Sequence, residues 1–334
     1  EELIDAIERQ YRELPFYVSA LNRTSRVALE LAEKLVARVP IPNAHVLFAA
    51  TGSEALDFLV KLIWFQANAR GTPARRTIIG RHGSYHGATL GSASLTGGHH
   101  EEFGLPLAGF RHVSQPDYHG ERAPGESSAD YAARLARELE DLIEREPRDT
   151  FGLAPAHMTI AKGITSGYFP LSAIAIGAEL YADLERGSQA VGTFAHAGTY
   201  AAHPVGAAAA LKTLEIIERD GLVPHAASMG ELLARGLRAL AGHPLVGDVR
   251  TLGLGGCLDF LKRDTDDRRL ASDDEAHATC MRVYDALFDL GVVARPAGRC
   301  LILAPPLIVQ PSEIDEICRR VGLALDRAVD AAGG

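Results

Sequence analysis

The sequence predicts an α/β protein followed by a smaller α+β domain. Strand-like and helix-like segments alternate as far as residue 220, which is typical of a sheet flanked by helices. After Gly221 the order changes to helix, long strand, helix and short strands. We therefore expect a large domain at 24–220 and a small domain at 221–334.

The first elements follow from apolar spacing. In chain order they are helix 1–13, helix 24–39, strand 45–50, helix 53–68 and strand 77–80. Pro40 and Pro42 end the second helix because proline cannot continue one. The helix at 53–68 is apolar on nearly all sides, which predicts that it is buried. The loop after strand 77–80 is rich in Gly, His and Ser up to about Phe103, and such loops often carry function.

The later elements of the large domain are an amphipathic helix at 128–146, short buried strands at 157–161 and 173–177, and a helix at 204–220. Proline near the start of that last helix and Gly221 after its end support both boundaries. In the small domain we expect helices at 224–241, 273–290 and from 312, a long strand at 246–261, and short strands at 292–295 and 301–304.

The composition favours a small-molecule partner. With 34 Lys+Arg against 43 Asp+Glu the net charge is −9, which disfavours nucleic acid or an anionic membrane as the main partner. No apolar run approaches the roughly 20 residues of a membrane helix. The four cysteines show neither CxxC nor matching His spacing, so we expect no zinc site, no disulfide framework and a cytoplasmic location. No signal peptide is visible in the first residues, and the missing methionine leads us to expect the natural N-terminus upstream.

The segment Phe48–Ala55 places Gly52 and Ser53 between a strand and a buried helix. Thr51 and Glu54 have the spacing of a capping box. Free backbone N–H groups, a glycine and a hydroxyl at a helix N-terminus suit a phosphate. The structural alternative is an ordinary helix cap.

Lys162 follows the apolar run 158–161 and precedes Gly163. Burial there would lower the pKa of its amine from about 10.4, and a neutral amine can form a Schiff base. The alternative is a lysine whose stem packs on the strand while its head reaches water.

Three further segments carry weaker signals. Tyr85 precedes His86 and Gly87 in the Gly/His loop, where its ring would cover a planar cofactor. Thr199 lies in a polar loop before a helix that starts with proline, and it would donate a hydroxyl; a simple helix-entry loop is the alternative. Arg295 stands at a strand end, where its planar guanidinium would bind a carboxylate or simply lie on the surface. The histidines lack ligand spacing, so we expect no metal.

Taken together and in this order, these segments resemble class III aminotransferases, the ω-aminotransferase branch of the fold-type I enzymes that use pyridoxal 5'-phosphate (PLP). The motifs that carry the resemblance are Phe48–Ala55, Tyr85-His-Gly87, Leu95-Thr-Gly97, Ala161–Gly167, Thr199–Pro204, Arg250 with Gly253, and Arg295–Pro306. They extend over nearly the whole chain. The implied fold is a large domain with a mixed, mostly parallel sheet between helices, and a smaller α+β C-terminal domain.

The resemblance also implies roles for individual residues. Lys162 would form the Schiff base with PLP and later move the proton between substrate and cofactor. Gly52 and Ser53 would bind the phosphate, and Tyr85 would lie against the pyridine ring. Thr199 would reach the phosphate in the neighbouring subunit of a homodimer. Arg295 would bind the carboxylate of an α-keto or amino acid.

One part of the family pattern is missing. The resemblance implies an aspartate that pairs with the pyridine nitrogen, in a segment with two strands between the Tyr-His-Gly loop and the lysine. Here residues 142–150 run directly into 151–160, and Glu146-Pro147 does not replace the missing segment. The sequence either joins pieces of a longer chain or has lost the segment. In the second case we expect little or no transamination.

Two smaller departures concern the substrate. Leu56 stands where many relatives have asparagine, and Ala20-Leu21 fall where some amine:pyruvate enzymes carry aromatic pocket residues. These differences predict a pocket open to bulky or long-chain amines.

The resemblance therefore predicts a PLP-dependent aminotransferase that moves an amino group from a primary amine or ω-amino acid to pyruvate or a similar α-keto acid. The alternatives are an aminomutase or racemase of the same fold, and a catalytically inactive dimeric binding protein. A Rossmann dehydrogenase is disfavoured because no GxGxxG follows a strand and opens a helix.

Overall fold

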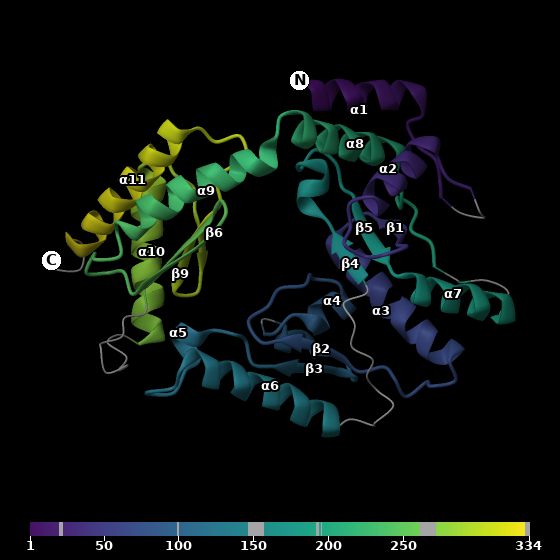
Figure 1. Cartoon of the computed structure of the whole chain (residues 1–334), viewed down its shortest axis with the longest axis horizontal. Helices are drawn as coiled ribbons and strands as arrows, with labels where there is room; N and C mark the ends of the chain where they lie inside the picture. The colour runs from purple at the N-terminus through teal and green to yellow at the C-terminus, as the bar shows by residue number, and fades with distance from the viewer. Residues whose placement is uncertain are drawn as a thin grey trace. The chain divides into compact units, whose positions relative to one another are not determined.

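The computed structural model describes residues 1–19, 23–98, 100–145, 157–191, 194, 196–260 and 272–330, which form two compact units (Figure 1). The N-terminal unit comprises Glu1–Pro116 and Ala132–Glu215, and the C-terminal unit comprises Asp117–Tyr131 and Ile216–Gly334. The last change of unit along the chain, at 215/216, lies close to the boundary expected at 220/221. The segment Asp117–Tyr131, which the sequence analysis placed in the large domain, groups with the C-terminal unit.

The helices of the N-terminal unit include all those predicted from apolar spacing. They are α1 (Glu2–Glu13), α2 (Arg26–Val36), α3 (Gly52–Ala69), α4 (Leu90–Leu95), the 3₁₀ helices η1 (Glu101–Phe103) and η3 (Lys162–Thr165), α7 (Ala178–Val191), and most of α6 (Ser128–Arg145) and α8 (Pro204–Arg219). The sequence analysis missed α4 and α7. Helix α4 is short and rich in Gly and Ser, so its propensity is low; the Asp57 carboxylate stabilises it by accepting a hydrogen bond from the Ser92 amide at 2.7 Å.

A three-stranded antiparallel sheet forms the centre of this unit, in the order β1 (His45–Ala49), β5 (Ser172–Ile176), β4 (His157–Ile160). The middle strand β5 is buried at every residue. On one face Ile174 and Ile176 pack with α3 and α7, and on the other Ala173 packs in a cluster with α2 and α8. The buried strand expected at 173–177 is thus confirmed.

The strand β4 is not buried as predicted. Its residues are half-buried or exposed, because β4 is an edge strand that pairs only with β5. Residue 161 is not part of it.

The mixed, mostly parallel sheet that the resemblance implies is not formed by the described residues, whose strand pairs in this unit are mostly antiparallel. The only parallel pair among them is β2 (Ile78–Arg81) with β3 (Phe110–Val113), which forms a separate two-stranded sheet. The segment that the family pattern places between residues 150 and 151 would supply two more strands, and the chain has no residues for them. Without those strands, β2 and β3 have no partners that link them to β4. The junction itself lies outside the described residues.

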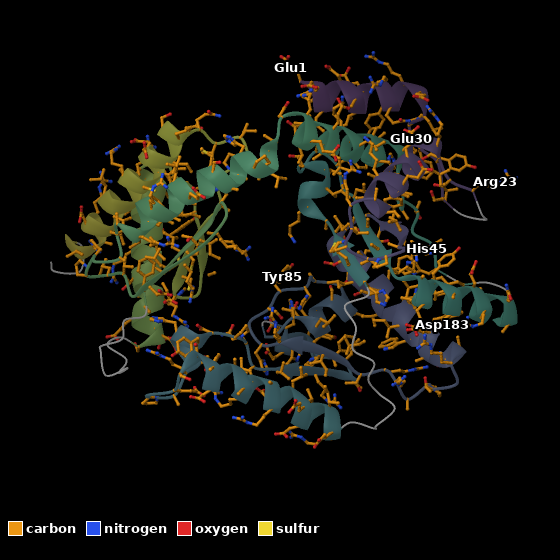
Figure 2. All side chains as sticks on the ribbon, viewed as in Figure 1. Glu1, Arg23, Glu30, His45, Tyr85 and Asp183 are labelled. Carbon is orange, nitrogen blue, oxygen red and sulfur yellow. The ribbon has the colours of Figure 1, made fainter. Side chains whose placement is uncertain are left out.

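Helix α3 is buried on two sides, as its apolar sequence predicts. Ala55, Phe58 and Leu62 pack with β5 and α7, while Val60 packs with Leu95 and Phe110. Asp183 on α7, labelled in Figure 2, is 1% exposed and joins the two helices. It accepts hydrogen bonds from Arg70 Nε at 2.6 Å and Gln66 Nε2 at 2.7 Å.

The C-terminal unit packs its three long helices on one face of an antiparallel sheet, which makes it an α+β unit. Its elements are α5 (Tyr118–Glu121), α9 (Leu222–Arg238), α10 (Asp273–Asp289), α11 (Pro311–Asp330), and the strands β6 (Asp248–Leu252), β7 (Gly255–Asp259), β8 (Arg295–Ala297) and β9 (Cys300–Leu303). The sheet order is β6-β7-β9-β8. The long strand expected at 246–261 is instead a hairpin, because Gly253 turns the chain with a φ of +51°.

Among the described helices, none is long and apolar enough to cross a membrane.

Candidate functional site

A cavity of about 620 Å³ in the N-terminal unit brings together four of the six predicted site residues. It lies between the N-terminus of α3, the loop at 85–87 and the segment after β4. Gly52, Ser53, Tyr85 and Lys162 all line it. These residues are up to 110 positions apart in the sequence, and the sheet and α3 bring them together.

The N-terminus of α3 forms one wall of this cavity. Thr51 caps the helix, its hydroxyl accepting a hydrogen bond from the Glu54 amide at 3.2 Å. The Glu54 carboxylate accepts from the Ala50 amide at 2.8 Å rather than from Thr51, so the predicted capping box is shifted by one residue. A Cβ on Gly52 would lie 3.3 Å from the Ala161 Cβ. Glycine thus allows the helix end to approach the segment that leads to Lys162.

The loop at 85–89 is held against Ser53. The Ser53 hydroxyl accepts a hydrogen bond from the Ala88 amide at 3.2 Å, and the Ser53 carbonyl oxygen accepts one from Thr89 Oγ1 at 3.3 Å. Gly87 has a φ of +135°, and a Cβ there would collide with Ser53. Tyr85 is 65% exposed at the cavity, which leaves its ring available to a bound group (Figure 2).

Of the two possibilities that the sequence left open for Lys162, the structure shows the second: the residue is exposed and its head reaches solvent. The reason is that β4 is an edge strand that ends at Ile160, and Lys162 is the first residue of η3. Its φ of +54° is uncommon for a residue other than glycine. Backbone strain of this kind is found preferentially at functional sites.

His86 also lines the cavity, although the sequence analysis gave it no role beyond its motif. Burial lowers the pKa of its imidazole, and the nearby Arg81 and His112 lower it further. The lowered pKa favours the neutral form of the ring at pH 7. A histidine beside a tyrosine and a glycine was the only sequence signal for it.

Thr199 and Arg295 are not among the residues that line this cavity. Thr199 is exposed in the turn before α8. Arg295 is exposed on β8 of the C-terminal unit, where it pairs with Ile302 of β9. Leu56 does line the cavity, whereas Ala20-Leu21 lie outside the described residues.

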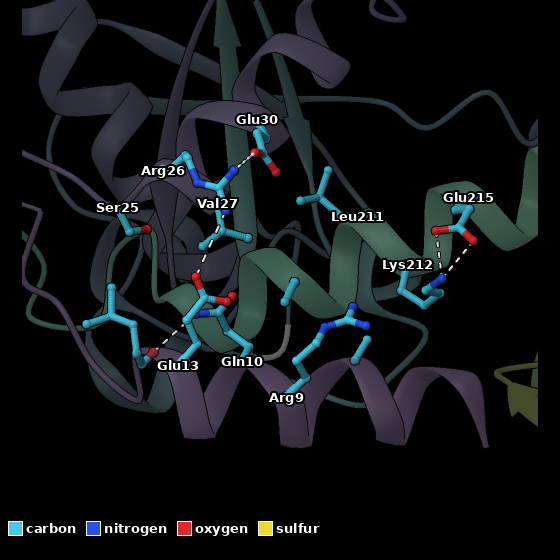
Figure 3. A pocket seen from close by; sticks show the side chains of 13 residues that line it. Arg9, Gln10, Glu13, Ser25, Arg26, Val27, Glu30, Leu211, Lys212 and Glu215 are labelled. Atoms are coloured by element: carbon cyan, nitrogen blue, oxygen red, sulfur yellow. Dashed lines mark hydrogen bonds and ion pairs between the residues drawn. The ribbon is translucent and has the colours of Figure 1, made fainter.

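A second hollow of about 240 Å³ lies between α1, α2 and α8 and contains none of the predicted residues (Figure 3). Its lining holds three basic and three acidic side chains, most of which pair with one another. Arg26 Nη1 lies 3.2 Å from Glu30 Oε1, and Lys212 Nζ lies 2.7 Å from Glu215 Oε1. This hollow therefore offers less uncompensated charge to an anion than the N-terminus of α3 does.

Comparisons with known proteins agree with the geometry. The sequence model of the family Aminotransferase class-III matches residues 1–150 and 147–325. An uncharacterized aminotransferase of Sinorhizobium fredii, y4uB, is 31% identical, with 98% of this chain and 83% of the relative covered. Putrescine–pyruvate aminotransferase of Pseudomonas aeruginosa is 29% identical, with 99% and 84% covered. The structure matches the omega transaminase of Pseudomonas jessenii in complex with PMP with a TM-score of 0.93 at 33% identity, covering 99% and 86% of the two chains.

The S. fredii comparison extends over 391 positions although this chain has 334 residues, so the relative carries residues without a counterpart here. The two matched segments of the family model meet at 147–150, next to the junction that the sequence analysis identified. The family match spans nearly all of the chain, and the structural match gives it the fold of the PLP-dependent fold-type I aminotransferases. The chain belongs to the class III aminotransferases, which are PLP-dependent enzymes.

Proposed function

We propose that this aminotransferase holds PLP in the 620 Å³ cavity and transfers an amino group from a primary amine or ω-amino acid to pyruvate or a similar α-keto acid. The observation that carries the proposal is the convergence of Gly52, Ser53, Tyr85 and Lys162 on one cavity. The substrate class is supported by the relative named putrescine–pyruvate aminotransferase.

The N-terminus of α3 fits the phosphate of the cofactor. The helix has 18 residues, and its first backbone N–H groups have no partner within the helix. The helix dipole favours an anion there. The Ser53 hydroxyl already accepts from Ala88, so its own proton is available to donate to a phosphate oxygen.

Two further residues of the cavity suit the ring and the aldehyde. Tyr85 offers an exposed aromatic face, and Lys162 offers a primary amine at the end of β4. When bound, PLP supplies an electron sink for the carbanion formed at the substrate. In this proposal Lys162 Nζ carries the proton that is removed from the amine-bearing carbon, because an amine placed at the cavity can act as general base and then as general acid.

The remaining roles extend beyond this cavity. We propose that Arg295 binds the carboxylate of the keto acid through its planar guanidinium. We also propose that Thr199 reaches the phosphate of a second subunit, so that a homodimer is the active assembly. We further propose two domains, a large one at 24–220 and a small one at 221–334. The same proposal includes a cytoplasmic location, because four free cysteines favour a reducing compartment. Leu56 adds apolar surface to the cavity, which suits the carbon chain of a long-chain amine.

One feature favours a second candidate, a PLP-binding protein with little or no transaminase activity. Of the described residues that line the cavity, none carries a carboxylate that would pair with the pyridine nitrogen. Without such a partner the ring nitrogen loses its proton more easily and withdraws electrons less strongly.

The decisive experiment separates binding from turnover. The purified chain is incubated with PLP and reduced with borohydride, and the modified lysine is located by peptide mapping. We expect a pyridoxyl group on Lys162, none in Lys162→Ala, and an unchanged yield in Lys61→Ala, because Lys61 does not line the cavity. Alanine formation from putrescine and pyruvate then measures transfer.

A label on Lys162 with transfer supports the aminotransferase. A label without transfer supports the second candidate. Absence of the label contradicts the assignment of this cavity.

A further inference from the structure

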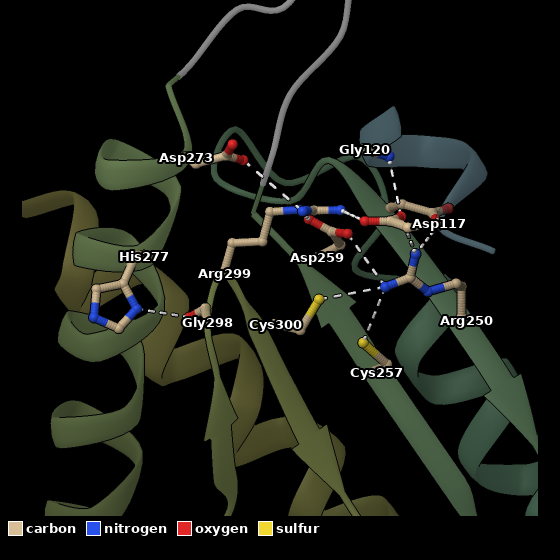
Figure 4. A network of polar contacts seen from close by, with 11 residues as sticks. Asp117, Gly120, Arg250, Cys257, Asp259, Asp273, His277, Gly298, Arg299 and Cys300 are labelled. Carbon is tan, nitrogen blue, oxygen red and sulfur yellow. Dashed lines mark hydrogen bonds and ion pairs between the residues drawn. The ribbon is translucent and has the colours of Figure 1, made fainter. Parts of the chain in front are cut away.

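Two cysteines lie side by side on the polar face of the C-terminal sheet (Figure 4). The sheet register places Cys257 of β7 directly between Arg250 of β6 and Ile302 of β9. Two residues further along β7, Asp259 lies opposite Cys300 of β9. Directly opposed residues share a face of a sheet, so both thiols project from one face. The other face carries the core residues of the unit, such as Leu258 and Leu301.

One arginine contacts both sulfur atoms. Arg250 Nη2 lies 3.6 Å from Cys257 Sγ and 3.3 Å from Cys300 Sγ. The same nitrogen donates to Asp259 Oδ2 at 3.2 Å. A positive charge in contact with a thiol favours the thiolate, which is the reactive form.

A network of ion pairs fixes the arginine in this position. Asp259 is fully buried and also accepts from Arg299 Nε at 3.0 Å. Arg299 Nη2 in turn lies 2.6 Å from Asp117 Oδ2. The Arg250 side chain is further flanked by Asp117 at 4.0 Å and Asp248 at 3.8 Å. The guanidinium is therefore held on the sheet beside the sulfurs rather than free in solvent.

The cysteines differ in acidity. The hydrogen bond with Cys257 and burial raise the pKa of the Cys300 thiol, so Cys257 is the acidic member of the pair. The hydrogen bond from Cys300 and the Arg250 guanidinium lower the pKa of the Cys257 thiol to about 6, although burial and the Asp259 charge oppose them. Burial raises the pKa of Cys280 to about 11, and it also raises that of Cys318. Cys257 and Cys300 are half-buried, whereas Cys280 is fully buried.

We propose that Cys257 and Cys300 form a site of reversible thiol oxidation that reacts with hydroperoxides. The Cys257 sulfur attacks the terminal oxygen of the hydroperoxide, an S–O bond forms, and the O–O bond breaks. The sulfur loses two electrons, and the departing oxygen takes up a proton to leave as water or an alcohol. The Cys300 sulfur then attacks the sulfenic acid, an S–S bond forms, and the hydroxyl group leaves as water with the Cys300 proton.

Formation of the disulfide between Cys257 and Cys300 requires a small movement of the two strands. Cys257 and Cys300 are diagonal rather than direct neighbours, and diagonal Cα atoms lie about 7–8 Å apart. Disulfides need about 4.4–6.8 Å, so β7 and β9 must approach each other slightly. A bond formed in this way is reversed readily by a thiol reductant, as expected of a regulatory rather than a structural disulfide.

The acidity is tested by alkylation with iodoacetamide across a pH series, with each cysteine quantified by mass spectrometry. Trypsin leaves Cys300 and Cys318 on one peptide, so cleavage at Glu313 or Glu316 with a Glu-specific protease separates them. We expect half-maximal labelling of Cys257 near pH 6, against about 8.5 for an ordinary thiol. At pH 6 Cys257 should therefore react with iodoacetamide about tenfold faster than an ordinary thiol does, after allowance for the weaker nucleophilicity of an acidic thiol.

Two substitutions of one residue separate acidity from disulfide formation. Cys300→Ser keeps a hydrogen-bond donor, so the pH of half-maximal labelling of Cys257 should stay low. Because the variant lacks the second thiol, hydrogen peroxide should produce no disulfide, and dimedone should trap a sulfenic acid on Cys257. Cys300→Ala removes this donor, so the pH of half-maximal labelling of Cys257 should rise.

Cys318→Ser is the matched control and should leave both the midpoint and the peroxide-induced bond between Cys257 and Cys300 unchanged. The proposal is overturned if Cys257 titrates at the pH of the denatured chain. It is also overturned if peroxide fails to join Cys257 to Cys300. Neither readout depends on PLP binding or turnover.

Discussion

Gly87 is the position where one added methyl group should disturb the cofactor cavity most directly. It lies between Tyr85 and Ala88, and the Ala88 amide binds Ser53 at the N-terminus of α3. In Gly87→Ala the new Cβ would collide with Ser53 Oγ, lie 2.6 Å from Ser92 Oγ and 2.9 Å from Ser53 Cβ. Both serines are on helices that the loop packs against, so the loop has to move away from α3.

The structure allows the cost to be worked out. A φ of +135° is strained for alanine, which costs about 1–3 kcal/mol. Overpacking against two serines costs about another 1–3 kcal/mol, so we expect a loss of about 2–6 kcal/mol from the stability of the N-terminal unit. Displacement of the loop also breaks the contact to Ser53, and we expect PLP to bind at least about tenfold more weakly, which corresponds to about 1.4 kcal/mol.

The chain provides both a reporter and a control. Its single tryptophan, Trp64, lies on α3, so urea unfolding followed by tryptophan fluorescence reports on this unit. Gly71→Ala is the matched control, because Gly71 also has a positive φ of +70° but nothing within 4 Å of its Cβ. The free energy of unfolding of Gly71→Ala should fall only by the cost of the strained backbone, about 1–2 kcal/mol. Equal losses in the two variants, or unchanged PLP affinity in Gly87→Ala, would refute the reasoning.

Three further predictions concern the same unit and the proposed substrate contact. Ser53→Ala should weaken PLP binding about 2–10-fold in an absorbance titration, because one hydrogen bond to the phosphate is lost; an unchanged affinity would contradict the assignment. Arg295→Gln should raise KM for the keto acid about 10–100-fold but leave KM for an uncharged amine nearly unchanged, and equal effects on both substrates would count against it. Burial by itself raises the pKa of Asp183, but hydrogen bonds from Gln66 and Arg70 outweigh it and hold the pKa below 3.8. The Asp183 ion pairs therefore stabilise the fold above about pH 4 and are lost as the pH falls through the lowered value. Wild type should lose more stability than Asp183→Asn between pH 5 and pH 3 in urea unfolding, and parallel curves would disprove this.

Much of the local structure could be predicted from the sequence. Helices α1, α2, α3 and α8 and strand β5 lie close to the predicted ranges, because their apolar spacing and caps depend on neighbouring residues. Helices α4 and α7 were missed. For α4 the reason is physical: contacts from Asp57 stabilise a segment whose own propensity is low.

The candidate site shows a similar division. The motifs at 52–53, 85 and 162 indicated a cofactor site, and the structure places these residues on one cavity. The sequence left open whether Lys162 is buried or exposed, since this depends on whether a further strand covers β4. That depends on pairing between distant segments, which local spacing does not encode.

The sequence by itself determined the order of the motifs, the family and the chemistry that the side chains can perform, because these depend on residue types and short spacings. Only the tertiary structure decided which of these residues meet. The split of the sheet into an antiparallel and a parallel part follows from pairing between segments far apart in the chain. The contact of Arg250 with Cys257 and Cys300 joins three strands whose residues are up to 50 positions apart. Such contacts depend on the burial and register of whole elements, and these are properties of the packed chain rather than of any single segment.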